Sequence, residues 1–168
     1  MTCFTPIDAW MSKRTNEKGN NYVTFNHAEA DKKSPVEVPC GRCDGCQLAK
    51  RKRLGVQLFH ESQMTDYSCM ATFTYDEEHN PGVIVKEDMQ KAIKRMRNRP
   101  FHLKFKYLVA GEYGENTHRP HFHMAIIGHD FLGGRGVKQV GESEYMNPVL
   151  TNLWGNGAVH IVPLTIER

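Results

Sequence analysis

Two histidines that alternate along the run from 118 to 127 are the residues of this chain whose types and spacing point most directly to chemistry. They are His121 and His123, separated by Phe122 in a stretch with the period of a β-strand. Side chains two residues apart on a strand point to the same face, with Cα atoms roughly 7 Å apart. Two neutral imidazoles can therefore chelate one metal ion while Phe122 is buried on the opposite face. The alternative is a pair of ordinary surface histidines on a half-exposed strand.

A second strand-like run, Tyr107–Tyr113, contributes a carboxylate to the same place. A polar loop over residues 114–120 joins the two runs, and antiparallel pairing through it places Glu112 near His121. Two histidines and a carboxylate form a site for a divalent ion with coordination positions left open for catalysis or substrate binding. Glu115 is the alternative third ligand, but it lies in the loop, whereas Glu112 is held at a strand end. The sequence therefore favours Glu112.

Three of the five cysteines form a second cluster with metal-ligand spacing. Cys40, Cys43 and Cys46 lie within seven residues, and Cys3 is the natural fourth ligand. Four thiolates give tetrahedral zinc a closed, structural site. An iron–sulfur cluster accepts the same ligands and is the less favoured alternative, and reduced thiols without metal are another. Cys69 opens an apolar strand and is interpreted as a packed core thiol.

The composition is that of a globular protein with a locally concentrated positive charge. The 168 residues are 39% hydrophobic and 24% charged, with a net charge of +3, which is typical of one domain with a core. No run of 18 apolar residues occurs, and the N-terminus lacks the apolar segment of a signal peptide, so we expect no membrane association and a cytoplasmic location. Eight lysines and arginines lie between Lys86 and Lys106, and a second block spans Lys50–Arg53. Such clusters attract phosphates, although solvated helix faces would give the same pattern.

The elements that must position these residues follow from hydrophobic periodicity. We expect helices over 47–63, 86–99 and 143–154, and strands over 67–75, 107–113, 118–127 and 158–162, with the glycine-rich segment 129–141 as a mobile loop. The strand over 67–75 should be central, and its Phe73 and Tyr75 should face the core. Residues 1–39 show no clear period beyond a short strand at Tyr22–Phe25.

The order strand, helix, strand, strand, helix, strand predicts an α+β fold with an antiparallel sheet that carries helices on one face. The other face is then free to hold the two histidines. We expect residues 1–46 to form an irregular N-terminal arm with the cysteine knuckle, and residues 47–168 to form the main domain.

Four motifs, in this order along the chain, resemble the replication initiators of small circular single-stranded DNA phages of the microvirus group, in particular gokushovirus-like members, which are HUH endonucleases. The motifs are Pro39–Cys46, Thr72–Asp76 followed by His79, Gly111–Glu115, and Arg119–His123. The resemblance implies an HUH-type sheet like that of ferredoxin or RNA-recognition domains, and a Mg or Mn ion on the two histidines. It also implies a location in the cytoplasm of the bacterial host, with single-stranded viral origin DNA and host replication proteins as partners.

The activity that the resemblance implies is nicking of one origin strand to start rolling-circle replication. A tyrosine attacks the scissile phosphodiester, stays joined to the 5′ phosphate and frees a 3′ hydroxyl for priming. The residues that we expect to contact DNA are Lys50, Arg51, Lys52, Arg53, Lys91, Lys94, Arg95 and Arg119.

The chain departs from this family at the nucleophile. In such initiators the tyrosine lies on a helix after the last strand, beside basic residues, and none of the six tyrosines of this chain matches that pattern. Tyr145, in an expected helical segment, is a weak candidate. We therefore expect the nucleophile to lie beyond Arg168, which leaves these residues with DNA binding but no strand transfer.

Two other functions fit some of the same residues. A metal-dependent phosphodiester hydrolase would use His121, His123 and Glu112 to activate water, and it would release a free 5′ phosphate instead of becoming attached to DNA. A DNA-binding module without catalysis would need only the four-cysteine zinc site, with the histidines idle. Its metal content would be one ion per chain instead of two.

Overall fold

The computed structural model describes residues 3–98 and 100–164, and the chain divides into two compact units. We call residues 1–57 the N-terminal unit and residues 58–168 the C-terminal unit. Helix α1 (Asp44–Ser62) begins in the first unit and ends in the second. Among the helices in the described ranges, none has both the length and the apolar character needed to cross a membrane.

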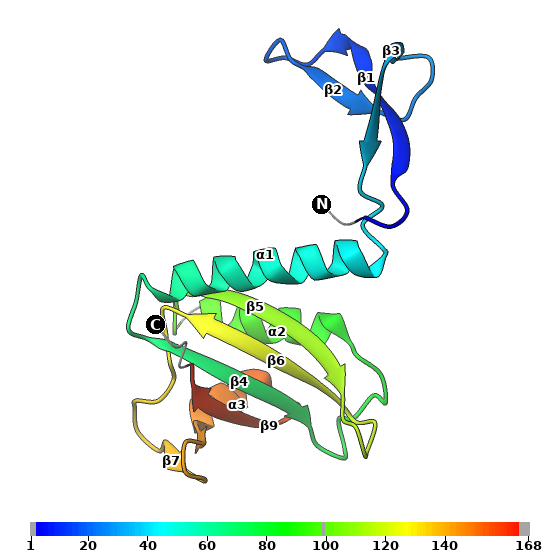
Figure 1. The fold of residues 1–168 in the computed structure, drawn as a ribbon. Helices are drawn as coiled ribbons and strands as arrows, with labels where there is room; N and C mark the ends of the chain where they lie inside the picture. The colour runs from blue at the N-terminus through cyan, green and yellow to red at the C-terminus, as the bar shows by residue number, and fades with distance from the viewer. Residues whose placement is uncertain (1–2, 99, 165–168) are drawn as a thin grey trace. The chain divides into compact units, whose positions relative to one another are not determined.

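The N-terminal unit contains a three-stranded antiparallel sheet in the order β2-β1-β3, followed by the start of α1 (Figure 1). Its strands are β1 (Ile7–Thr15), β2 (Asn21–Thr24) and β3 (Ala30–Val38). The irregular arm expected for this region is therefore wrong, although β2 coincides with the short strand expected there. The sheet escapes a hydrophobic-period search because its buried residues, among them Ser12 and Thr24, are small or polar.

The C-terminal unit is a six-stranded sheet in the order β5-β6-β4-β9-β8-β7, in which every pairing is antiparallel. The expected central place of the strand at 67–75 is confirmed, because β4 lies between β6 and β9. The elements of this unit are β4 (Ser68–Tyr75), α2 (Lys86–Arg97), β5 (Lys106–Tyr113), β6 (Pro120–Ile127), β7 (Lys138–Gln139), β8 (Tyr145–Met146), α3 (Pro148–Trp154) and β9 (Gly157–Pro163).

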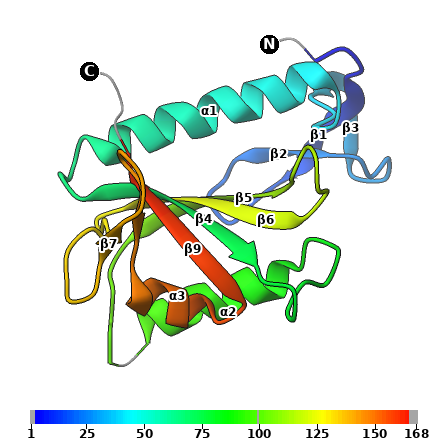
Figure 2. The same cartoon turned by 90° about the horizontal axis from the view of Figure 1, so that it is seen from below.

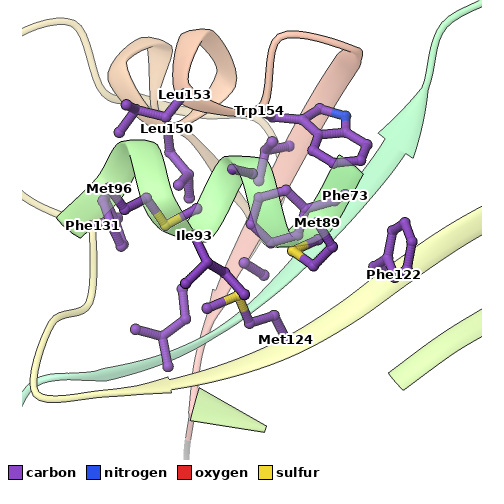
Figure 3. Packing of buried hydrophobic residues seen from close by; sticks show 14 of the residues in the cluster. Phe73, Met89, Ile93, Met96, Phe122, Met124, Phe131, Leu150, Leu153 and Trp154 are labelled. Carbon is purple, nitrogen blue, oxygen red and sulfur yellow. The ribbon is translucent and has the colours of Figure 1, made fainter. Parts of the chain in front are cut away.

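The core lies between the sheet and the two helices α2 and α3, which cover the same face (Figure 2). Burial alternates along β4, so that Phe73 is fully buried and Tyr75 is 2% exposed, as predicted. Figure 3 shows Phe73 and Met124 of the sheet packed under Met89, Ile93 and other apolar residues of the helices. Trp154 of α3 lies against Phe73 with ring centroids 5.5 Å apart. The opposite face of the sheet, which carries His121 and His123, is called the histidine face below.

The helix expected over 143–154 is shorter than predicted. Tyr145 and Met146 form strand β8, and the helix α3 begins only at Pro148. Asn147 sets this boundary, because its side-chain oxygen accepts hydrogen bonds from the amides of Val149, at 2.9 Å, and Leu150. A proline at the first helical position has no amide to satisfy and fits this start. The expected mobile loop over 129–141 likewise contains the short strand β7.

Gly157 fixes how β9 pairs with β4. Its φ of +143° is a conformation that L side chains rarely adopt, and a Cβ added there would lie 2.3 Å from the carbonyl oxygen of Thr74. The close approach lets Gly157 pair with Tyr75, which in turn places His160 opposite Thr72. The register of the last strand therefore depends on the missing side chain.

Candidate functional site

The pairing of β5 with β6 brings together the three residues predicted to bind a divalent ion. Glu112 lies opposite His121 in the register, as expected from the connecting loop. The Nε2 atoms of His121 and His123 are 3.2 Å apart. An oxygen of Glu112 lies 3.3 Å from Nε2 of His123 and 3.9 Å from Nε2 of His121. Three potential ligand atoms thus converge on one point of the histidine face.

Hydrogen bonds at the other ring nitrogens orient both imidazoles. Nδ1 of His121 lies 3.2 Å from the carbonyl oxygen of Arg119, which can only accept, so Nδ1 carries the proton. Nδ1 of His123 is 3.1 Å from the hydroxyl of Thr72, its neighbour across the β6–β4 pairing. In both residues Nε2 is left to face the cluster with its lone pair. This is the arrangement that outer partners give to metal-binding histidines.

The separations fit a divalent ion. Ligands at adjacent positions of an octahedral Mg²⁺ site, with bonds of about 2.1 Å, lie about 3 Å apart. The three side chains approach from the sheet side only, and the Glu112 side chain is 62% exposed, so positions toward solvent stay open. Among the described residues, the ligand group contains Glu112 and not Glu115. The alternative third ligand thus has no support in the geometry.

The four cysteines also converge. The Sγ atoms of Cys3, Cys40, Cys43 and Cys46 all lie within 4.8 Å of one another, and those of Cys3 and Cys43 are 3.9 Å apart. Thiolates around tetrahedral zinc, at bonds of about 2.3 Å, are separated by about 3.8 Å. A disulfide needs about 2.05 Å, and all four residues are free cysteines. The group has the dimensions of a structural metal site.

Hydrogen bonds to sulfur favour the thiolate form that metals bind. The hydroxyl of Thr5 donates to Sγ of Cys40 at 3.3 Å, and the amides of Cys43 and Arg42 donate at 3.4 and 3.5 Å. Together they lower the pKa of the Cys40 thiol to about 5, the Thr5 hydroxyl contributing most. Burial has the opposite effect on Cys69, whose pKa it raises to about 12. The expected core role of Cys69 is confirmed, since its side chain is fully buried.

These pKa shifts predict selective alkylation of the metal-free protein. Because the pKa of Cys40 is lowered, its thiolate persists as the pH falls and is lost only below about pH 5, whereas an ordinary thiol protonates below about 8.5. Iodoacetamide at pH 6 should therefore modify Cys40 in metal-free protein and leave Cys69 intact, as peptide mass spectrometry can measure. Added zinc should protect Cys40. Equal rates at Cys40 and Cys69 would contradict the assignment.

The predicted DNA-contacting residues fall in different surroundings. Lys50, Arg51, Lys52 and Arg53 are all exposed on α1 in the N-terminal unit. Lys91 and Lys94 are exposed on α2, whose apolar side packs on the core face, so they lie across the sheet from the two histidines. The guanidinium of Arg95 donates to the carbonyl oxygens of Leu153 and Trp154, so it ties α2 to the end of α3.

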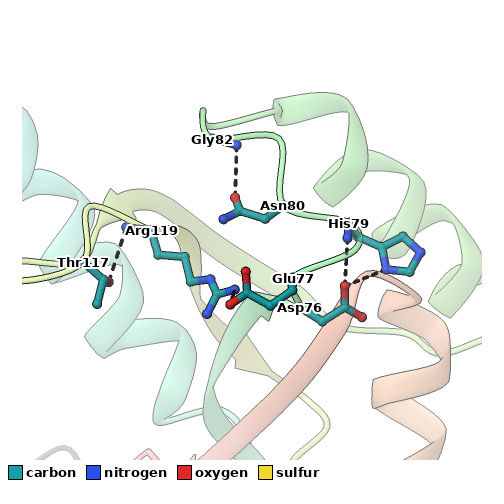
Figure 4. A network of polar contacts seen from close by, with 7 residues as sticks. All are labelled: Asp76, Glu77, His79, Asn80, Gly82, Thr117 and Arg119. Atoms are coloured by element: carbon teal, nitrogen blue, oxygen red, sulfur yellow. Dashed lines mark hydrogen bonds and ion pairs between the residues drawn. The ribbon is translucent and has the colours of Figure 1, made fainter.

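Arg119 belongs to a polar network at the end of β4 (Figure 4). Its guanidinium donates to the carboxylate of Glu77. The carboxylate of Asp76 accepts from the backbone amide of His79 at 2.8 Å and contacts its ring Nδ1 at 2.7 Å. The His79 amide, with the ring, lowers the pKa of Asp76. The network fixes the turn after β4 beside the start of the histidine strand β6.

The tyrosines of the six-stranded sheet do not reach the ligand group. Tyr145 pairs with the buried Ile161 and packs against the core cluster, so the weak candidate nucleophile faces away from the histidines. Tyr75 is buried in the same core and donates to Asp88 at 3.1 Å. Tyr107 and Tyr113 alternate with Glu112 along β5 and therefore point to the opposite face.

Two residues of the histidine face were not identified from the sequence. Thr72 supports His123, and His160 lies two strands away in the same cross-strand row. Nδ1 of His160 is 2.7 Å from a carboxylate oxygen of Glu144. Alternation was the available signal, because His160 stands between the core residues Val159 and Ile161. The partner Glu144 lies in a segment expected to be helical, which hid the pair.

Comparisons with known proteins agree with this site. Residues 68–167 match the model of a family described as replication-associated protein ORF2. Replication-associated protein VP4 of Bdellovibrio phage phiMH2K is 28% identical over 182 aligned positions, which cover 99% of this chain and 55% of the relative. Replication-associated protein ORF2 of Spiroplasma virus 4 is 29% identical, with coverages of 98% and 57%. Replication-associated protein ORF4 of Chlamydia phage 1 is 29% identical, with coverages of 74% and 34%.

The chain spans little more than half the length of the Bdellovibrio phage and Spiroplasma virus proteins, and about a third of the Chlamydia phage protein. No solved structure matches it. The family match covers more than half of the chain and includes every strand that carries the histidine cluster. The predicted kinship with microvirus-like replication initiators is confirmed, and the chain belongs to the replication-associated protein ORF2 family.

Proposed function

We propose that this protein initiates phage replication by nicking one strand of origin DNA, through metal-assisted transesterification, to start rolling-circle synthesis. The observation that carries the proposal is the convergence of Glu112, His121 and His123, within 4.8 Å of one another, on the exposed histidine face. The relatives' printed names, replication-associated proteins of three phages, support a role in replication.

The chemistry follows from what these residues can hold. His121, His123 and Glu112 would bind Mg²⁺ or Mn²⁺, which supplies Lewis-acid activation of a phosphate oxygen. The carbonyl of Arg119 and the hydroxyl of Thr72 keep both imidazoles turned toward the ion. The bond from a tyrosine oxygen to phosphorus forms as the bond to the 3′ oxygen breaks, and the 3′ oxygen takes up a proton. The attacking tyrosine is none of the four in the sheet.

The topology supports an HUH-type fold for residues 47–168. Omitting the short strands β7 and β8, the chain order is strand, helix, strand, strand, helix, strand, and the spatial order is β5-β6-β4-β9. This is the split βαβ arrangement of ferredoxin-like sheets. Both helices of the motif cover one face, so single-stranded DNA would lie across the other, over the row that contains His123, Thr72 and His160.

The cysteine cluster would hold zinc in a structural role, with an iron–sulfur cluster as the alternative. The four thiols leave no position for substrate, because tetrahedral zinc is saturated by four ligands. Cys3 precedes β1 and Cys40 follows β3, so one ion would join the two ends of the three-stranded sheet. The exposed block Lys50–Arg53 follows directly and would contact DNA phosphates. The proposed setting is the cytoplasm of the bacterial host, with host replication proteins as further partners.

Iron-directed cleavage tests whether DNA lies over the ligand group. Two histidines and a carboxylate also suit Fe²⁺. With Fe²⁺, ascorbate and peroxide, hydroxyl radicals formed at the site should cut a bound origin strand within a few nucleotides of one position. The double variant His121→Ala/His123→Ala should bind the strand and lose this cut. Uniform cutting, or a focused cut that survives in the variant, would overturn the proposal.

Product analysis separates the proposed reaction from its alternatives. Residues 1–168 incubated with origin-strand DNA and Mn²⁺ should form no covalent adduct on a denaturing gel, because the four sheet tyrosines face the core side. An adduct abolished by Tyr145→Phe would make Tyr145 the nucleophile. Multiple turnovers that release free 5′ phosphate would favour the hydrolase.

A further inference from the structure

A cavity of about 680 Å³ lies in the C-terminal unit at the beginning of β5, away from the ligand group. Its volume is in the range of sites that bind small organic molecules. Leu103 and Phe105 form part of an apolar floor, and Ile127 at the end of β6 contributes to it. The site described above uses none of these residues.

Positive charge surrounds this apolar floor. Arg97, His102, Lys104 and Lys106 all line the cavity, against the single carboxylate of Glu61. Glu61 pairs with the ammonium group of Lys106. The remaining cationic groups, on Arg97 and Lys104, give the cavity an excess of positive charge. An apolar floor with a cationic rim fits a ligand that is flat and apolar at one end and anionic at the other.

Arg97 also forms a stacking surface. Its guanidinium carbon lies 4.9 Å from the centre of the Phe105 ring and 5.1 Å from that of Tyr107. A hydrogen bond of 2.9 Å from the guanidinium to the carbonyl oxygen of Phe105 holds it there. Guanidinium planes and aromatic rings are the two surfaces on which proteins stack unpaired nucleobases. Tyr107 is 42% exposed, so the platform is accessible from solvent.

The distance to the ligand group suits a single DNA strand that reaches both. Lys106 lies opposite Ile127 at one end of the β5–β6 pair, and Glu112 lies opposite His121 near the other. Six residues of antiparallel strand separate Lys106 from Glu112, which is about 20 Å. A strand several nucleotides long can therefore lie on both.

We propose that this cavity binds one unpaired nucleotide, with the base stacked against Arg97 and its phosphate on Lys104. The proposal rests on the proposed function for its source of nucleotide, which is the single-stranded origin DNA some nucleotides from the scissile phosphate. The chemistry is shared with a free mononucleotide, and the experiment separates the two sources.

The test is photocrosslinking of a 5-iodouracil oligonucleotide series to residues 1–168 in EDTA, with affinity measured by fluorescence anisotropy. A crosslink at Phe105 or Tyr107 is expected from one iodouracil position in the series. Lys104→Glu should weaken binding at least about tenfold, and Lys104→Met should lower the salt slope by about 0.7, the share of one single-strand phosphate contact. Lys138→Glu makes the same charge change on β7, at the opposite edge of the sheet, and should have a smaller effect.

Arg97→Lys keeps the charge and removes the planar group, so it should lose the crosslink while the salt slope is kept. Unchanged Mn²⁺ affinity of that variant shows that the sheet is folded. Equal effects of Lys104→Glu and Lys138→Glu, with no crosslink at the cavity, would overturn the proposal even if the histidine cluster binds Mn²⁺. A crosslink in a protein that binds no Mn²⁺ would sink the proposed nicking function and keep the cavity. Displacement of the oligonucleotide by micromolar thymidine monophosphate would identify the free nucleotide as the ligand.

Discussion

Replacing both His121 and His123 with alanine should reduce the affinity for Mn²⁺ by far more than 100-fold. The change removes two of the three side-chain ligands and leaves Glu112, a single exposed carboxylate, to hold the ion. Loss of an outer hydrogen-bond partner alone typically costs 10- to 100-fold in metal affinity, so Thr72→Val, which removes the hydroxyl beside His123, should fall in that range. Electron paramagnetic resonance of free Mn²⁺ measures all three affinities directly.

His160→Ala is the matched control for this experiment. His160 lies on the same face and in the same cross-strand row, but it pairs with Glu144 instead of the ligand group. Its removal should leave Mn²⁺ binding unchanged. If the double variant binds Mn²⁺ as tightly as the parent, the assignment of His121 and His123 as ligands fails.

Removing zinc should unfold the N-terminal unit and leave the C-terminal unit folded. Structural zinc contributes about 10–16 kcal/mol of apparent binding free energy, which is folding free energy when the site exists only in the folded state. The three-stranded sheet has few buried apolar side chains, so nothing else of that size stabilises it. The sheet of the C-terminal unit has its own core, centred on Phe73 and Trp154.

Hydrogen exchange measured by mass spectrometry distinguishes the two units. After chelation of zinc, amides of β1 and β3 should exchange at rates near those of an unfolded chain, while those of β4 and β6 stay protected. Cys40→Ser should reproduce this pattern, and Cys69→Ala, which alters a thiol outside the cluster, should not expose β1. Elemental analysis identifies the metal. A metal-free protein with full protection of β1 would show that the cluster is not a metal site.

The parts of the fold that the sequence predicted are those with a strong hydrophobic period. Strands β4, β5 and β6 and helix α2 fall within a few residues of the expected ranges, because alternate apolar residues on each must be buried together. The position of Glu112 beside His121 followed from the length of the loop between their strands. Both predictions depend on local pattern and chain connectivity, which a single sequence contains.

The parts that could not be predicted depend on contacts between distant residues. Ser12 is fully buried and accepts a hydrogen bond from the amide of Tyr22, an interaction that no periodicity indicates. Arg95 was grouped with DNA-binding residues by charge, but it binds backbone carbonyls at the end of α3, nearly sixty residues away. His160 acquires its carboxylate partner only because β8 pairs with β9.

Gly157 connects the fold to the site in a way that genetics can detect. The position has no room for any Cβ, yet it is three residues from His160 and its own atoms do no chemistry. In a library of all single substitutions selected for phage propagation, every allele other than glycine should be lost at 157. At Gly133, where a Cβ would meet nothing within 4 Å, many alleles should survive. An allele lost at 157 would look like a defect of the active site, although its origin is the register of one strand.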